Sequence, residues 1–290
     1  MSDANSALPH GAEAIRVATG LGELAALVWG APDAPPLLAL HGWLDNAASF
    51  WRLAPLLASR RRVIALDLPG HGHSAHLPPG LRRYHVVDQV DVVLDAAVAL
   101  GFARFDLLGH SLGAGIAALL ASAAPAQVGA LLLIDGLGPL ADDGSQTLER
   151  WRTAAAERQR VPRTPRVFAR IEDAVAARVA VGGMDADEAR PIVERNLHAV
   201  DGGHAWRSDA RLRATSPWRI DEMQLRSLLT AIESPTRLLL AQPATPYLPT
   251  AMMEARAACV ADIHVTRIAG PHHLHLREAE AVAAALLPSL

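Results

Sequence analysis

A serine stands between two glycines where an apolar run meets an apolar helical pattern. The segment is Gly109-His110-Ser111-Leu112-Gly113, and it matches the pattern G-x-S-x-G. It lies between "FDLL" and "LGAGIAALL", a context that predicts a tight strand-to-helix turn. Such a turn lifts the serine hydroxyl above the sheet at a helix N-terminus, where negative charge is favoured. Ser111 is therefore the candidate nucleophile. The alternative is a glycine-rich turn with a chance serine.

Three histidines follow the last predicted strand and are candidates for a general base. The segment "AGPHHLHLREAE" contains His272, His273 and His275. A histidine beside a serine hydroxyl can take its proton and later return it to a leaving group. A metal site is the alternative. One short cluster gives poor geometry for a closed metal shell, and no nearby Cys or Asp completes it.

A carboxylate at the end of another apolar run could orient that histidine. "ALLLID" ends in Asp135, and an unpaired charge is costly to bury. A serine–histidine pair needs a buried carboxylate to hold the imidazole in the required tautomer. Asp135 follows Ser111 by 24 residues, which is one helix and one strand, so the two strand ends should be neighbours. The alternative is a helix N-cap or a turn-bracing Asp135.

Apolar runs and helical patterns alternate through most of the chain. This alternation predicts a mostly parallel sheet with helices on both faces. Strands are expected over residues 24–29, 36–42, 62–72 (with a Gly/Pro turn), 104–111, 128–135, 235–242 and 263–270. Helices are expected over residues 47–58, 86–100, 112–123 and 277–287.

The alternation breaks between about residues 140 and 232. This stretch is rich in arginine, mostly helical in pattern and without a clear buried strand. We expect a helical cap over 140–232, inserted between core segments 1–139 and 233–290, above the strand ends where open α/β sheets bind ligands. Residues 195–209 could form a lid loop. Four aromatic residues could line an apolar pocket or only form the core of the cap: Trp151, Phe168, Trp206 and Trp218.

These motifs resemble the α/β-hydrolase superfamily over nearly the whole chain apart from the insertion. "LLALHGWLDNAASFWRLAPLL", "VIALDLPGHGHS", "LLGHSLGAGIAALLA" and "LLLIDGLGPL" come in the order and spacing of that family. Within it, "HGWLDN", "DLPGHG" and "IDGLGP" look like the serine hydrolase-like proteins. The resemblance implies an α/β core of about eight strands and a helical cap after the sixth. It also implies a serine, acid, histidine order along the chain.

The resemblance also assigns an oxyanion hole and a base. The residue after His41-Gly42 and the residue after the nucleophile donate backbone N–H groups in this family, which here are Trp43 and Leu112. His41 is expected to brace its loop. Pro271-His272 stands where the family has Gly-His, so His272 is the expected base, with His273 as the alternative because the register is uncertain by one residue. His275 is expected to pack beneath the loop.

The usual acid of the family is absent here. It follows the seventh strand in a G-x-x-D pattern, whereas this chain has "LLLAQPATPYLP", with no Asp or Glu between Thr236 and Ala251. Some members carry the acid at the end of the sixth strand, and the spacing of Asp135 resembles that of haloalkane dehalogenases of this kind. Asp135 is therefore the expected third member of the triad. Glu254 and Asp262 are weaker candidates by position.

Composition and local patterns argue against other classes of function. The 290 residues are 51% hydrophobic with a formal net charge of −3, and the single Cys259 cannot form an internal disulfide. The N-terminus resembles no secretory signal, and no apolar run approaches the roughly 20 residues of a membrane span. "HGHSAH" has Ala75 where the zinc motif H-x-H-x-D-H requires Asp. The arginines between residues 150 and 170 interleave with acidic residues, which indicates a solvated cap helix rather than a nucleic-acid surface.

We therefore expect a cytoplasmic serine hydrolase, monomeric or homodimeric. It would cleave a small carboxylic ester or related acyl compound through an acyl-enzyme, without metal or organic cofactor and without a nucleic-acid or membrane partner. The alternative is a non-catalytic protein that binds a small molecule on the same fold, because fold does not fix function.

Overall fold

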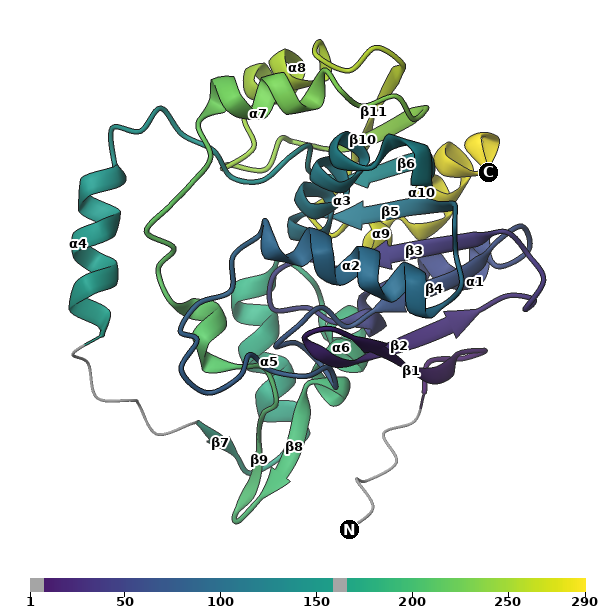
Figure 1. Ribbon diagram of the computed structural model, residues 1–290. Coiled ribbons are helices and arrows are strands. Elements are labelled where there is room, and N and C mark those ends of the chain that lie inside the picture. The colour runs from purple at the N-terminus through teal and green to yellow at the C-terminus, as the bar shows by residue number, and fades with distance from the viewer. Residues whose placement is uncertain (1–7, 159–165) are drawn as a thin grey trace.

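Eight strands form one sheet in the computed structural model, which describes residues 8–158 and 166–290 (Figure 1). The strand order is β1-β2-β4-β3-β5-β6-β10-β11. β1 and β2 are antiparallel, β2 is antiparallel to β4, and the other neighbours run parallel. This confirms the predicted mostly parallel α/β sheet. The bounds are Glu13–Thr19 (β1), Gly22–Trp29 (β2), Pro36–Leu40 (β3), Arg62–Leu66 (β4), Phe105–His110 (β5), Val128–Ile134 (β6), Thr236–Gln242 (β10) and Ile263–Ala269 (β11).

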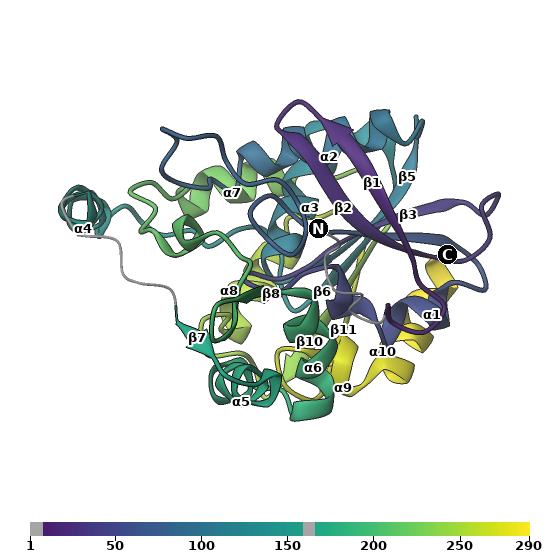
Figure 2. The same ribbon diagram turned by 90° about the horizontal axis from the view of Figure 1, so that it is seen from below.

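Helices cover both faces of the sheet, as Figure 2 shows. One face packs against α2 (Asp88–Ala99), α3 (Leu112–Ala123), α7 (Glu222–Leu229) and α8 (Thr250–Ala257). The other packs against α1 (Leu53–Leu57), α9 (Leu274–Arg277) and α10 (Ala279–Leu286). Alternate residues of a strand point to opposite faces, so β3 contributes side chains to both layers, such as Leu38 to one and Leu37 to the other.

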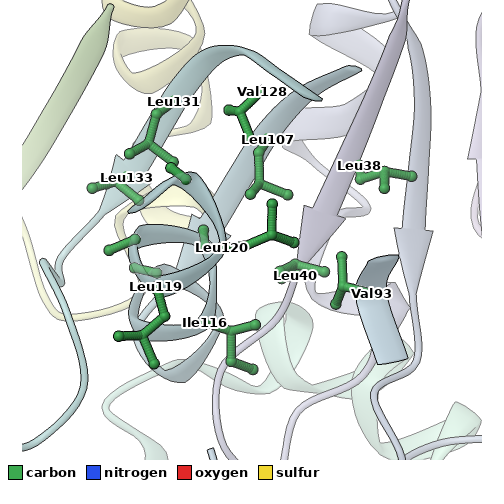
Figure 3. Packing of buried hydrophobic residues seen from close by; sticks show 14 of the residues in the cluster. Leu38, Leu40, Val93, Leu107, Ile116, Leu119, Leu120, Val128, Leu131 and Leu133 are labelled. Atoms are coloured by element: carbon green, nitrogen blue, oxygen red, sulfur yellow. The ribbon is translucent and has the colours of Figure 1, made fainter. Parts of the chain in front are cut away.

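Helix α3 is apolar on every side because it lies between the sheet and other helices. Nine of its residues are buried. Its Ile116 and Leu120 pack with Leu107 and Leu133 of the two strands beneath (Figure 3). This packing fixes the position of the residue before the helix, which is Ser111.

Two local predictions differ from the structure. The single helix expected over residues 47–58 is instead a 3₁₀ helix at Ala47–Phe50 followed by α1. Pro55 lacks a backbone N–H and is tolerated in the first turn of a helix, so the α-helix starts just before it. Strand β1 was not predicted, because it is an edge strand with mostly exposed residues and no apolar run.

The inserted region contains both helices and strands. Helices α4 (Thr147–Glu157), α5 (Ile171–Gly182) and α6 (Ala186–Arg195) are joined by a small sheet in the order β7-β9-β8, whose strands are Val167–Phe168 (β7), Leu197–Val200 (β8) and Gly203–Trp206 (β9). The helical pattern of this stretch did not indicate these strands, because strands of two to four residues contain no apolar run, and each of them has a single buried residue. Likewise, residues 195–209 form a hairpin and not a lid loop, with Asp201-Gly202 between its strands. The predicted span 140–232 also includes α7, which packs against α3.

Buried polar contacts hold α5 and α6 to loops beside the main sheet. Arg195 at the end of α6 pairs with Asp67 (2.8 Å), and Arg178 of α5 pairs with Asp45 (2.5 Å). Removing one partner of a buried ion pair strongly destabilises the folded protein. These contacts therefore fix α5 and α6. The ribbon of α4 lies apart from them in both views (Figures 1 and 2), but α4 is bonded to other segments, because Arg83 donates to the carbonyl of Ala154 (2.6 Å) and Thr215 donates to Glu157 (2.7 Å). No helix of the described residues is both long and apolar enough to cross a membrane.

Candidate active site

Ser111 lies on a strained turn between β5 and α3. Its φ is +52° and its ψ is −113°, a conformation that non-glycine residues rarely adopt. A Cβ atom at Gly109 would lie 2.5 Å from the carbonyl oxygen of Gly113, and one at Gly113 would collide with the carbonyl oxygen of Leu40. Only glycine fits at the positions two residues before and two residues after the serine, as the G-x-S-x-G pattern predicts.

Asp135 directly follows β6 and holds four hydrogen bonds. Its backbone N–H donates to Leu239 (2.7 Å). Oδ1 accepts from the N–H of Ala241 (3.0 Å), and Oδ2 accepts from the hydroxyl of Thr245 (2.5 Å) and from Nδ1 of His272 (2.6 Å). Burial raises the pKa of Asp135, but the hydrogen bonds from His272, Ala241 and Thr245 outweigh it, so the net pKa is lowered. The carboxylate is thus held ionised against His272.

The three histidines of the "PHHLH" segment have three different partners. His272 contacts Asp135, His273 donates from Nε2 to Asp45 (3.3 Å), and Nε2 of His275 lies 2.8 Å from the Ser49 hydroxyl. His272 is therefore the histidine beside the predicted acid, and the alternative His273 is paired elsewhere. His275 is fully buried beneath the loop, as expected.

His110 connects the serine turn to the histidine loop. Its Nε2 donates to the backbone carbonyl of His272 (3.0 Å), so the residue before Ser111 holds the candidate base in place. Because a neutral imidazole has one N–H, Nδ1 of His110 is a bare acceptor, and it has no hydrogen-bond partner among the described residues.

Asp45, His110 and His273 form a buried group whose ligand atoms lie within 4.8 Å of one another, a spacing that a metal ion could bridge. The guanidinium of Arg178 already neutralises Asp45 at 2.5 Å and would repel a second cation there. It also holds the pKa of Asp45 well below its usual range against the opposing effect of burial. We therefore interpret this group as an ion-paired support for the histidine loop.

Neither predicted metal alternative gathers its ligands. Among the described residues, the histidines of residues 71–76 and the trio His272, His273 and His275 are not in a group with metal-ligand spacing. Asp67 directly follows β4. It accepts from the N–H groups of Ala47 and His73, at 2.7 and 2.8 Å, and so braces the loop that contains His73.

Buried histidines should make the fold sensitive to acid. Burial lowers the pKa of His71 to about 3 and that of His275 to about 3, and it lowers that of His110 well below its ordinary value. The unfolded chain binds protons near pH 6.5 and the folded chain does not, so stability falls as the pH drops from about 6.5 toward 3. Each such histidine contributes about 1 kcal/mol per pH unit in that window.

The free energy of urea unfolding should therefore fall steadily between pH 6.5 and 4.5 and change little between pH 7 and 8. His71→Gln should reduce the slope, while His264→Gln, at an exposed position, should not. A wild-type slope that is flat below pH 6.5 would contradict the neutral state of these histidines.

Two backbone N–H groups are available beside the serine. Leu112 is the first residue of α3, and its N–H has no acceptor within the helix. Within the described ranges, no backbone acceptor is bonded to the N–H of Leu112 or of Trp43. His41 braces the Trp43 loop by donating from Nδ1 to Gly42 (2.7 Å) and accepting from the N–H of Leu68 (3.0 Å). This geometry is compatible with the predicted oxyanion hole.

A cavity of about 1810 Å³ brings these groups together. It is lined by Ser111, His272, Asp135, Trp43 and Leu112. Three of the four aromatic residues named as possible pocket residues line this cavity. Phe168, Trp206 and Trp218 line the cavity, and Trp151 does not, because it lies exposed on α4. The weaker acid candidates lie elsewhere: Glu254 pairs with Arg267, and neither Glu254 nor Asp262 lines the cavity.

Sequence reasoning missed Thr245 and Tyr247, which occupy the loop where the usual acid of the family would lie. The Tyr247 ring packs edge-on against His272, with centroids 5.5 Å apart. Burial and the charge of Asp135 raise the pKa of Tyr247, and the nearby Ser111 hydroxyl opposes this rise. Only the absence of a carboxylate in "QPATPYLP" could have drawn attention to this loop.

Comparison with known proteins shows which proteins this chain resembles. Residues 35–178 match the sequence profile described as alpha/beta hydrolase fold. The chain is 30% identical over 288 residues to a serine hydrolase-like protein of Danio rerio, with 95% of this chain and 87% of that protein covered. A serine hydrolase-like protein of Dictyostelium discoideum is also 30% identical, over 96% of this chain and 81% of that protein.

A solved structure matches over nearly the same length. The hypothetical protein PA1622 from Pseudomonas aeruginosa PAO1 has a TM-score of 0.87 and 39% identity, covering 95% of this chain and 98% of that chain. The fold and the names of the relatives support a hydrolase-type function. From its sequence relatives and its sheet topology, the chain belongs to the α/β-hydrolase superfamily.

Proposed function

We propose that this protein is a serine hydrolase that cleaves a carboxylic ester or a related acyl compound. The observation that carries the proposal is the 2.6 Å contact between Nδ1 of His272 and Oδ2 of Asp135, in the same cavity as the strained Ser111. A carboxylate on Nδ1 leaves Nε2 as the ring nitrogen for proton transfer. The assigned roles are nucleophile for Ser111, base for His272 and orienting acid for Asp135.

The first half of the reaction forms an acyl-enzyme. The Ser111 hydroxyl attacks the acyl carbon while His272 takes its proton, and the carbonyl oxygen becomes an oxyanion. The backbone N–H groups of Trp43 and Leu112 stabilise that charge. When the intermediate collapses, the bond to the leaving group breaks and His272 gives the proton to the departing oxygen or sulfur.

The second half releases the acid. A water molecule attacks the acyl-serine, and His272 takes a proton from that water. The same two N–H groups stabilise the oxyanion of the second tetrahedral intermediate. The bond to Ser111 Oγ breaks, and His272 returns the proton to the serine. The net reaction adds one water across the acyl bond, so it requires no oxidant, reductant or cofactor.

Thr245 should act as a positioning residue for Asp135. Its hydroxyl bonds the same carboxylate oxygen as His272, and a hydrogen bond to a charged group is worth about 1.5–3 kcal/mol. We expect Thr245→Val, which keeps the shape and removes the donor, to lower kcat about tenfold with little change in KM. Steady-state kinetics on a p-nitrophenyl ester measures this effect. Thr245→Ser should restore kcat. Equal activity of all three proteins would show that Thr245 does not position Asp135.

A non-catalytic binding protein is the second candidate. The observation that favours it is the absence of an acid after β10, since a protein that lost turnover could keep the cavity. Assaying p-nitrophenyl esters of increasing acyl length separates the two. We expect saturable release of p-nitrophenol by the wild type, whereas saturable ester binding with no product would support the binding protein.

A further inference from the structure

The cavity above Ser111 is lined by more positive than negative groups. Five arginines contribute to its walls: Arg150, Arg166, Arg178, Arg213 and Arg219. Two of them are neutralised, because Arg150 pairs with Asp142 (2.5 Å) and Arg178 pairs with Asp45 (2.5 Å). The other three have no such partner among the described residues.

Arg166, Arg213 and Arg219 are exposed and form no ion pair with any residue of the described ranges. Arg166 lies over the Phe168 ring at 4.6 Å, a contact that leaves its charge uncompensated. The two carboxylates of the cavity wall cannot serve them, since Asp45 is paired with Arg178 and Asp135 with His272. The sequence between Arg158 and Arg166 contains no acidic residue either.

The positions of these arginines place the positive charge near the opening. Leu212, the neighbour of Arg213, accepts a hydrogen bond from Nε1 of Trp43 (3.1 Å), so this segment lies over the loop that provides an oxyanion-hole N–H. Trp218, the neighbour of Arg219, is 62% exposed. By contrast, much of the remaining wall is apolar and includes Val86, Leu119, Phe168, Ile220 and Leu248.

We propose that the substrate is an amphiphile whose apolar part occupies the cavity and whose anionic group stays at the opening, against Arg213 and Arg219. This inference rests on the proposed function and names its substrate class. Guanidinium groups bind carboxylates and phosphates through paired N–H donors. A cavity lined by one sign of charge also raises the local concentration of an oppositely charged ligand.

Matched substrates test the charge and distinguish its source. Decanoyl-4′-phosphopantetheine and decanoyl-pantetheine share an acyl group and differ only in the phosphate of the leaving group. The p-nitrophenyl monoester of sebacic acid and p-nitrophenyl decanoate differ in a carboxylate at the acyl end. The protein with Arg213→Gln and Arg219→Gln should lose about tenfold in kcat/KM for the anionic member of one pair. The pair that shows the loss identifies which end carries the anion.

The control variant is Arg60→Gln, an exposed arginine in the turn before β4 that is remote from the cavity lining. It should leave all four rates unchanged. Added salt should reduce kcat/KM of the wild type for the anionic substrate and have little effect on the double variant, because exposed charges are screened. Equal losses for anionic and neutral substrates, or no loss for either, would overturn the proposal.

A binding measurement keeps this test independent of turnover. Ser111→Ala protein titrated with decyl phosphate should bind it more tightly than decanol, and the two arginine substitutions should weaken only the phosphate, about tenfold. If the wild type hydrolyses nothing but this preference holds, the proposed function fails and the anionic ligand stands. If esters are hydrolysed but no probe is sensitive to the arginines, the ligand class fails alone.

Discussion

Ser111→Ala is expected to abolish ester hydrolysis while leaving the fold intact. The variant removes the only atom assigned to attack the acyl carbon, and kcat should fall by about 10⁶, as found when the serine of a protease triad is removed. The turn itself should survive, because Gly109 and Gly113 give it room and neither serine nor alanine is preferred at φ +52°. Hydrolysis of a p-nitrophenyl ester and urea unfolding of the same preparation measure both effects.

Ser122→Ala is the matched control for this variant. Ser122 lies on α3, the helix that follows Ser111, and donates to the carbonyl of Ala118, away from the cavity. Its substitution should leave kcat unchanged. If Ser111→Ala kept more than about one-hundredth of the wild-type rate, the nucleophile would have to be another group.

Asp135→Asn is expected to lower kcat on the order of 10⁴, by analogy with the same change in a serine protease triad. An amide can donate to Nδ1 of His272 and hold the imidazole in the wrong tautomer, with its proton on Nε2, and it cannot stabilise an imidazolium. KM should change little, because Asp135 is 1% exposed and lies behind the histidine. Full activity in this variant would contradict the assignment of Asp135, at the end of β6, as the triad acid.

Glu254→Gln is the matched control, since Glu254 is a weaker acid candidate by position and is paired with Arg267 on the surface. It should retain wild-type kcat.

A pH series gives a second test of Asp135. Because the folded pKa of Asp135 is lowered, its contribution to stability is present above the unfolded pKa of about 4 and is lost as the pH falls below it. The stability difference between the wild type and Asp135→Asn should therefore shrink on acidification.

Patterns read directly from neighbouring residues predicted most of the core. The helix 112–123 agrees with α3 at both ends, because a glycine-flanked serine starts it and its apolar residues are continuous. The segments that failed are those whose structure depends on distant contacts. Strand β1 pairs with β2 through its backbone and has few buried side chains, and the strands β7, β8 and β9 are too short to show a period.

The site was predictable where one segment carried the chemistry. The elbow of Ser111 follows from its own glycines, and the pairing of Asp135 with a histidine follows from an otherwise uncompensated charge. Thr245 and Arg178 gave no such signal. A threonine in a loop and an arginine in an arginine-rich segment are common, and their partners, Asp135 and Asp45, lie 110 and 133 residues away along the chain.

The most direct test of the triad is intact-mass labelling with a fluorophosphonate probe, which reacts with an activated serine and needs no knowledge of the substrate. Wild type, Ser111→Ala and Asp135→Asn would be labelled in parallel. We expect a single adduct on the wild type, none on Ser111→Ala, and labelling slowed by orders of magnitude on Asp135→Asn. No adduct on folded wild-type protein would contradict an activated serine and leave the binding-protein alternative, with Asp135 as a residue that braces the loop after β10.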